Sequence, residues 1–128
     1  MAKVVGSVDG RSRPVIRING KHESILVVVD TGFNGALMLT RTAANLLGAD
    51  PIRRETEVEL GDGRTVLVKE ANALIPWLGR ERRVRVLVSD AWAPVGDEPV
   101  GLLGTELLAP HLLLVDFTEG TVEIETQG

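Results

Sequence analysis

The stretch Ile25-Leu26-Val27-Val28-Val29-Asp30-Thr31-Gly32 ends an apolar run with a carboxylate, a hydroxyl and a glycine. Its five apolar residues are continuous rather than alternating, which is typical of a strand buried on both faces. Burial disfavours the charged form of a carboxyl group, so an Asp at the end of such a strand needs a reason. One reason is a functional role for Asp30. The simpler alternative is a turn, since Asp, Thr and Gly are all turn formers.

The composition describes an ordinary globular chain. It has 128 residues, of which 44% are apolar and 25% charged, so we expect one domain spanning residues 1–128. Cysteine is absent, which excludes disulfides, thiolate metal sites and cysteine nucleophiles. With only two histidines as well, we expect no bound metal and no cofactor.

Charge and hydropathy exclude further classes of partner. The net charge is -4 and only four residues are aromatic, which argues against nucleic acid as a ligand. No apolar run approaches the ~20 residues of a membrane span, so we expect no membrane partner. The first residues show no signal-peptide pattern, and the expected location is the cytoplasm.

Turn signals separate short β-branched runs along most of the chain, which predicts an all-β domain. One hairpin is expected to turn tightly at Asn19-Gly20, and another at Gly61-Asp62-Gly63. A short helix is predicted after the N-cap residue Thr40 and ends at Gly48. A second short helix is predicted over residues 105–109. The expected strands span residues 13–18, 24–29, 36–39, 57–60, 64–69, 71–75, 83–89, 112–117 and 121–125.

Three features follow one another along the chain. They are the Asp-Thr-Gly triplet, the glycine-tipped hairpin at 61–63, and Leu102-Leu103-Gly104 leading into a short helix. Each has a simple structural interpretation as a turn, a hairpin tip or a core strand ended by glycine. Their order and spacing, over residues 15–124, resemble the retropepsin-like aspartic proteases, and Phe33-Asn34-Gly35 is more similar to single-domain bacterial members than to viral ones.

The resemblance implies a fold and an activity. The fold would be a single-lobe, closed-barrel acid-protease fold, all-β with one or two short helices. The activity would be that of an aspartic endopeptidase acting on a peptide or protein substrate. Because the triplet occurs once, activity would require a homodimer in which water is activated between two Asp30 carboxylates, one from each subunit.

The resemblance also assigns roles to neighbouring residues. Thr31 would hydrogen-bond across the dimer axis, and Gly32 would let the substrate backbone approach closely. Leu103 and Gly104 would pack beneath the Asp loop. Gly61, Asp62 and Gly63 would form the tip of a flap that closes over the peptide. Phe33 and Asn34 are the candidate substrate-binding residues.

Some features of the sequence leave other interpretations open. Asn34 and Thr105 stand near the positions where viral enzymes carry the Asp and Arg that latch their dimer, so that ion pair is missing. The cluster Arg80, Arg82, Arg83 and Arg85 is best explained as a solvated strand face rather than a nucleic-acid site. The main alternative function is a non-catalytic dimerisation or peptide-binding module on the same fold.

Overall fold

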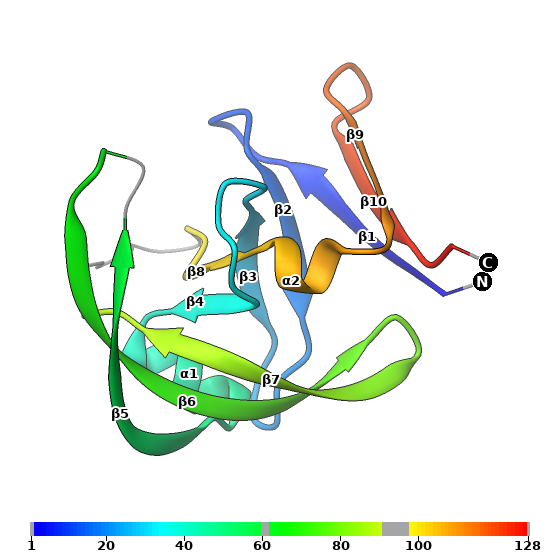
Figure 1. Cartoon of the computed structure of the whole chain (residues 1–128). Helices are drawn as coiled ribbons and strands as arrows, with labels where there is room; N and C mark the ends of the chain where they lie inside the picture. The colour runs from blue at the N-terminus through cyan, green and yellow to red at the C-terminus, as the bar shows by residue number, and fades with distance from the viewer. Residues whose placement is uncertain (1, 60–61, 91–97, 128) are drawn as a thin grey trace.

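The computed structural model describes residues 2–59, 62–90 and 98–127. Strands dominate the chain, and two short helices accompany them (Figure 1). In chain order the elements are β1 (Lys3–Val8), β2 (Pro14–Ile18), β3 (Ile25–Val29), β4 (Leu37–Leu39), α1 (Arg41–Leu47), β5 (Asp50–Glu59), β6 (Thr65–Trp77), β7 (Arg80–Val88), β8 (Gly101–Leu103), α2 (Thr105–Leu108), β9 (Leu112–Asp116) and β10 (Thr121–Glu125).

The strands form one ten-stranded sheet in the order β5-β6-β7-β4-β8-β3-β2-β1-β10-β9. The all-β prediction is confirmed, but the predicted closed barrel is wrong. β5 and β9 lie at opposite edges of the sheet. The β5–β7 ribbon and the β1, β9 and β10 strands point in different directions, so the two edges do not meet (Figure 1).

The centre of the sheet joins segments that are distant in sequence. β8 lies between β3 and β4, and it pairs in parallel with β3, where Val29 is opposite Leu103. It pairs antiparallel with β4, where Leu37 is opposite the same Leu103. The loop that connects β3 to β4 therefore crosses the end of β8, and Asp30 is the first residue of that loop.

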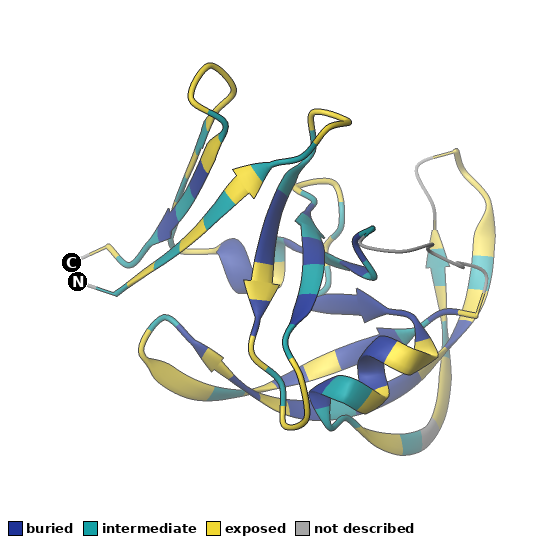
Figure 2. Cartoon of the chain, turned by 180° about the vertical axis from the view of Figure 1, so that it is seen from behind, coloured by how far each residue is buried: buried dark blue, intermediate teal, exposed yellow. Residues whose placement is uncertain are grey.

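The main core cluster joins side chains of most strands to those of α1 and α2, and its buried residues are dark blue in Figure 2. The largest side chains with almost no exposed surface are Ile16, Leu37, Leu39, Leu47, Ile75, Leu103, Leu107 and Ile124. α1 begins as predicted, because the Thr40 hydroxyl accepts the Ala43 N–H at 3.1 Å. Gly48 ends it in the left-handed conformation.

The β2–β3 connection differs from the predicted tight turn. Ile18 pairs with Ile25, so the loop holds residues 19–24 rather than the two residues Asn19-Gly20. The longer loop docks on the end of α1, where the N–H groups of Lys21 and His22 donate to the Leu47 and Leu46 carbonyls at 3.1 and 3.0 Å. These bonds satisfy carbonyls that the helix end leaves without partners. A long-range contact therefore overrides the local turn signal.

Two further elements differ from the sequence-based expectation. The runs 64–69 and 71–75, expected as two strands, form the single long strand β6. β1 was not predicted, yet it joins β2 to β10 in the sheet. In the part of the chain that the structure describes, no helix is long and apolar enough to cross a membrane.

Candidate active site

Asp30 is held at the end of β3 by its own backbone. Its N–H donates to the Leu103 carbonyl at 2.8 Å, which extends the β3–β8 pairing by one bond. Its carbonyl accepts the Phe33 N–H at 3.2 Å, and its Oδ1 accepts the Gly32 N–H at 2.8 Å. The side chain is half-buried. These bonds shape a tight turn that fixes the carboxylate relative to the sheet.

The far arm of the Asp30 loop is fixed by β8 and α2. The Gly104 N–H donates to the Ala36 carbonyl at 3.0 Å. The Phe33 carbonyl accepts two bonds from Thr105, one from its N–H at 2.8 Å and one from its hydroxyl at 3.3 Å. The Leu103 side chain is fully buried next to these contacts. The loop of residues 30–36 is thus bound at both ends to the segment 103–105.

Gly104 has no space for a side chain. A Cβ at this position would lie 2.3 Å from the Gly35 carbonyl oxygen and 2.4 Å from the Phe33 carbonyl oxygen. Both contacts are with backbone that is itself hydrogen-bonded, so relief requires the Asp30 loop to move. Glycine is therefore required at the third position of Leu102-Leu103-Gly104, because a side chain there would collide with the Asp30 loop.

We expect Gly104→Ala to lower the free energy of unfolding by about 1–3 kcal/mol, because the added methyl overpacks the loop. Urea denaturation measures the change. Gly10→Ala is the matched control, since a Cβ there meets nothing within 4 Å. Equal midpoints for the Gly104→Ala protein and the wild type would contradict the steric role of Gly104.

The tip of the Asp30 loop faces solvent. Thr31 and Gly32 are both exposed. A Cβ on Gly32 would meet only Asp30 Oδ1, at 3.2 Å. Among the residues that the structure describes, nothing covers the tip, so the space over it is available to a ligand or to another polypeptide.

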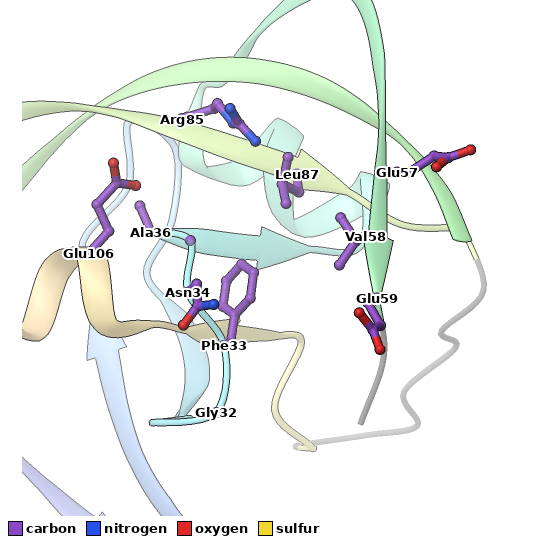
Figure 3. A pocket seen from close by; sticks show the side chains of 11 residues that line it. Gly32, Phe33, Asn34, Ala36, Glu57, Val58, Glu59, Arg85, Leu87 and Glu106 are labelled. Atoms are coloured by element: carbon purple, nitrogen blue, oxygen red, sulfur yellow. The ribbon is translucent and has the colours of Figure 1, made fainter. Parts of the chain in front are cut away.

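A pocket of about 370 Å³ lies beside this tip. One wall is the loop itself, from Gly32 to Ala36, and the opposite wall comes from β5 and β7 (Figure 3). The lining residues are Gly32, Phe33, Asn34, Gly35, Ala36, Glu57, Val58, Glu59, Arg85, Leu87 and Glu106. Both candidate substrate-binding residues thus line a pocket at the Asp30 loop, and Asn34 is the more exposed of the two.

Phe33 connects the two walls of the pocket. Its ring lies at the centre of the pocket, with Val58 and Leu87 beside it (Figure 3). The same ring belongs to a small apolar cluster that joins the loop to β5, β6 and β7, with Met38, Val58, Val66, Val68, Leu87 and Leu102. Phe33 therefore packs the part of the β5–β6 hairpin near its turn against the loop that carries Asp30.

Comparisons with known proteins agree with this geometry. No protein-family model matches the sequence, and no curated protein matches it. Among solved structures, a retropepsin-like aspartic protease from Rickettsia conorii is similar, with 18% identity and a TM-score of 0.61, covering 95% of this chain and 89% of that one. EIAV protease complexed with the inhibitor HBY-793 is also similar, with 25% identity and a TM-score of 0.56, covering 78% of this chain and 88% of that one.

The chain has a retropepsin-like fold. Within this fold Asp30, Gly32, Leu103 and Gly104 lie together around one loop. Their chemical roles stay predictions.

Two of the predicted flap residues, Asp62 and Gly63, lie at the end of the β5–β6 hairpin in this retropepsin-like fold. Gly61 is outside the described residues. Asp62 and Gly63 are exposed, and the Asp62 carboxylate accepts the Arg64 N–H at 3.0 Å and binds Arg64 Nε at 2.6 Å. Neither residue lines the pocket, whose β5 wall is formed lower on the hairpin by residues 57–59.

Several pocket residues of the retropepsin-like fold were not predicted. They are Glu57, Val58, Glu59, Arg85, Leu87 and Glu106. The alternation of acidic and apolar residues along 57–59 was a sequence signal for this wall. It places the apolar Val58 on the strand face opposite to its two acidic neighbours. Among the residues that the structure describes, no group of three or more His, Asp or Glu side chains is arranged to hold a metal ion.

Proposed function

We propose that the chain is an aspartic endopeptidase that acts as a homodimer. The observation that carries this proposal is the position of Asp30, half-buried at the end of a core strand in a retropepsin-like fold, in a loop that β8 and α2 fix at both ends. An open pocket beside the loop tip supplies a place for a substrate side chain.

The proposed chemistry uses two copies of Asp30. Two carboxylates held close together share one proton, because both cannot easily ionise. The ionised member takes a proton from a water molecule, which attacks the carbonyl carbon of the scissile peptide bond. The protonated member donates a hydrogen bond to the carbonyl oxygen and stabilises the charge that develops there. The chain contains Asp-Thr-Gly once, so the second carboxylate comes from a second chain.

The exposed surface supports a partner at the loop tip. Thr31 is exposed and carries a hydroxyl that is able to hydrogen-bond across a two-fold axis. The Asp30 loop, the β1–β2 turn and the β9–β10 turn all project toward one side of the molecule (Figure 1). We propose that the second copy meets this side. Thr105 is engaged with the Phe33 carbonyl, so this dimer forms without the viral latch.

A homodimer makes the rate depend on concentration. Below the dissociation constant of the dimer, cleavage per subunit is expected to rise in proportion to the protein concentration, and above it to level off. Initial rates on a peptide library, measured over a dilution series and compared with sedimentation velocity of the same samples, check this. Cleavage per subunit that stays constant while the protein is a monomer contradicts the proposal. A dimer that binds peptides and cleaves none supports the non-catalytic module instead.

A further inference from the structure

We propose that the pocket beside the Asp30 loop selects a lysine or arginine side chain of the peptide substrate. The inference rests on the proposed function, and it concerns only which substrates the enzyme prefers. Two properties of the pocket carry it. Its floor is apolar, and its rim has more carboxylates than cations.

The floor suits the aliphatic stem of a long side chain. Phe33, Val58 and Leu87 present an aromatic ring and two branched aliphatic groups to the pocket (Figure 3). The ring packs closely against two glycines, because a Cβ would lie 2.6 Å from Phe33 Cζ at Gly35 and 2.7 Å from Phe33 Cδ2 at Gly104. The methylene groups of lysine or arginine gain from such a surface while the charged end stays in water.

The rim attracts a positive charge. Glu59 and Glu106 lie on opposite sides of the Phe33 ring, one on β5 and the other on α2 (Figure 3). α2 is bound to the Asp30 loop at this point, since the Glu106 N–H donates to the Gly35 carbonyl at 3.3 Å. Glu57 adds a third carboxylate on the outer side of β5. A cationic group in the pocket therefore lies between carboxylates from two separate elements.

The cation that lines the pocket is already engaged. Arg85 Nη2 lies 3.5 Å from Oε1 of Glu70, a residue of β6 that is only 2% exposed. The second oxygen of the same carboxylate binds Arg54 Nε at 2.6 Å. Glu70 thus holds Arg85 against the sheet, but it shares its single negative charge with Arg54 and offsets only part of the charge of Arg85. The two rim carboxylates, Glu59 and Glu106, outnumber the one guanidinium, which disfavours an acidic substrate side chain.

The test begins with a peptide library cleaved by the full-length protein. Mass spectrometry of the products identifies the substrate position at which basic residues are enriched. Three otherwise identical peptides then carry lysine, norleucine or glutamate at that position. We expect kcat/KM to be roughly tenfold higher for lysine than for norleucine, and lowest for glutamate, because charge-assisted contacts form only with lysine. Added salt is expected to reduce the ratio.

The double variant Glu59→Gln/Glu106→Gln isolates the rim charge. In this variant we expect the lysine-to-norleucine ratio to fall at least about threefold. The matched control is Glu23→Gln/Glu81→Gln, which removes the same net charge at two exposed residues outside the pocket and is expected to keep the ratio. A wild-type ratio near one, a preference for glutamate, or an unchanged ratio in the pocket variant overturns the inference.

A separate readout distinguishes failure of this inference from failure of the proposed function. Cleavage of any peptide without a preference for lysine overturns the inference alone. If no peptide is cleaved, fluorescence anisotropy with the labelled lysine and norleucine peptides decides the question. Tighter binding of the lysine peptide that is lost in Glu59→Gln/Glu106→Gln then supports the pocket preference, while equal binding overturns it.

Discussion

The Asp30→Asn protein is expected to cleave peptides at least about 10³-fold more slowly than the wild type while keeping its fold and its dimer. The amide has nearly the shape of the carboxylate, and its oxygen still accepts the Gly32 N–H that shapes the loop. It takes no proton from water, so the general base is lost. Mass spectrometry of library digests and thermal unfolding of both proteins measure the two parts of this prediction. Asp50→Asn, at an exposed residue of β5, controls for the change in charge.

Mixing the two proteins sharpens the test of the paired site. When Asp30→Asn protein is added in excess to wild type, subunit exchange converts active homodimers into hybrids with one carboxylate. Activity is then expected to fall as the fraction of wild-type homodimers falls. Full activity in the presence of a large excess of the variant, with exchange confirmed by native mass spectrometry, would show that one Asp30 suffices.

Leu103→Ala is expected to lower the free energy of unfolding by about 3 kcal/mol. The Leu103 side chain is fully buried, so its removal loses apolar contacts and leaves a cavity beneath the Asp30 loop. Chemical denaturation monitored by tryptophan fluorescence measures the loss. Leu74→Ala is the matched control, because Leu74 is 50% exposed and is expected to change stability by less than about 1 kcal/mol. Similar losses in the two variants would argue against Leu103 as a supporting residue.

The sequence predicted those elements whose causes are local. Thr40 and Gly48 start and end α1 through bonds within a few residues, and both were predicted. The β9–β10 hairpin was predicted because its turn lies between its own two strands. The tight turn at Asn19-Gly20 was wrong because the loop binds the end of α1, a contact that local sequence does not encode.

The openness of the sheet and the insertion of β8 between β3 and β4 depend on pairings between distant segments. Patterns of hydrophobicity indicate that a strand is buried, but they do not name its neighbour. The closed barrel was inferred from a resemblance, and the separation of the β5 and β9 edges overturned it.

The residues of the candidate site also fall into those that the sequence predicted and those that it did not. Asp30 was predicted because an acid at the end of a buried strand is unusual in itself, and Gly104 was predicted because the order and spacing of Leu102-Leu103-Gly104 and the Asp-Thr-Gly triplet resemble a known family. The opposite wall of the pocket was not predicted, because Glu59 and Arg85 are exposed charged residues of strands, and such residues are common and do not indicate a site. Their position beside the Asp30 loop arises from the curvature of the β5–β7 ribbon, which no short motif reports.

The position of β8 has a consequence for synthesis of the chain. Asp30 is made early, but the strand that shapes its loop is Gly101–Leu103, near the other end of the sequence. A growing polypeptide therefore contains Asp30 long before it contains β8, the strand that hydrogen-bonds to Asp30 and shapes its loop. Unfinished and prematurely terminated products lacking β8 are expected to be inert toward the proteins around them. On the proposed function, this order of assembly limits cleavage to chains in which β8 is already in place.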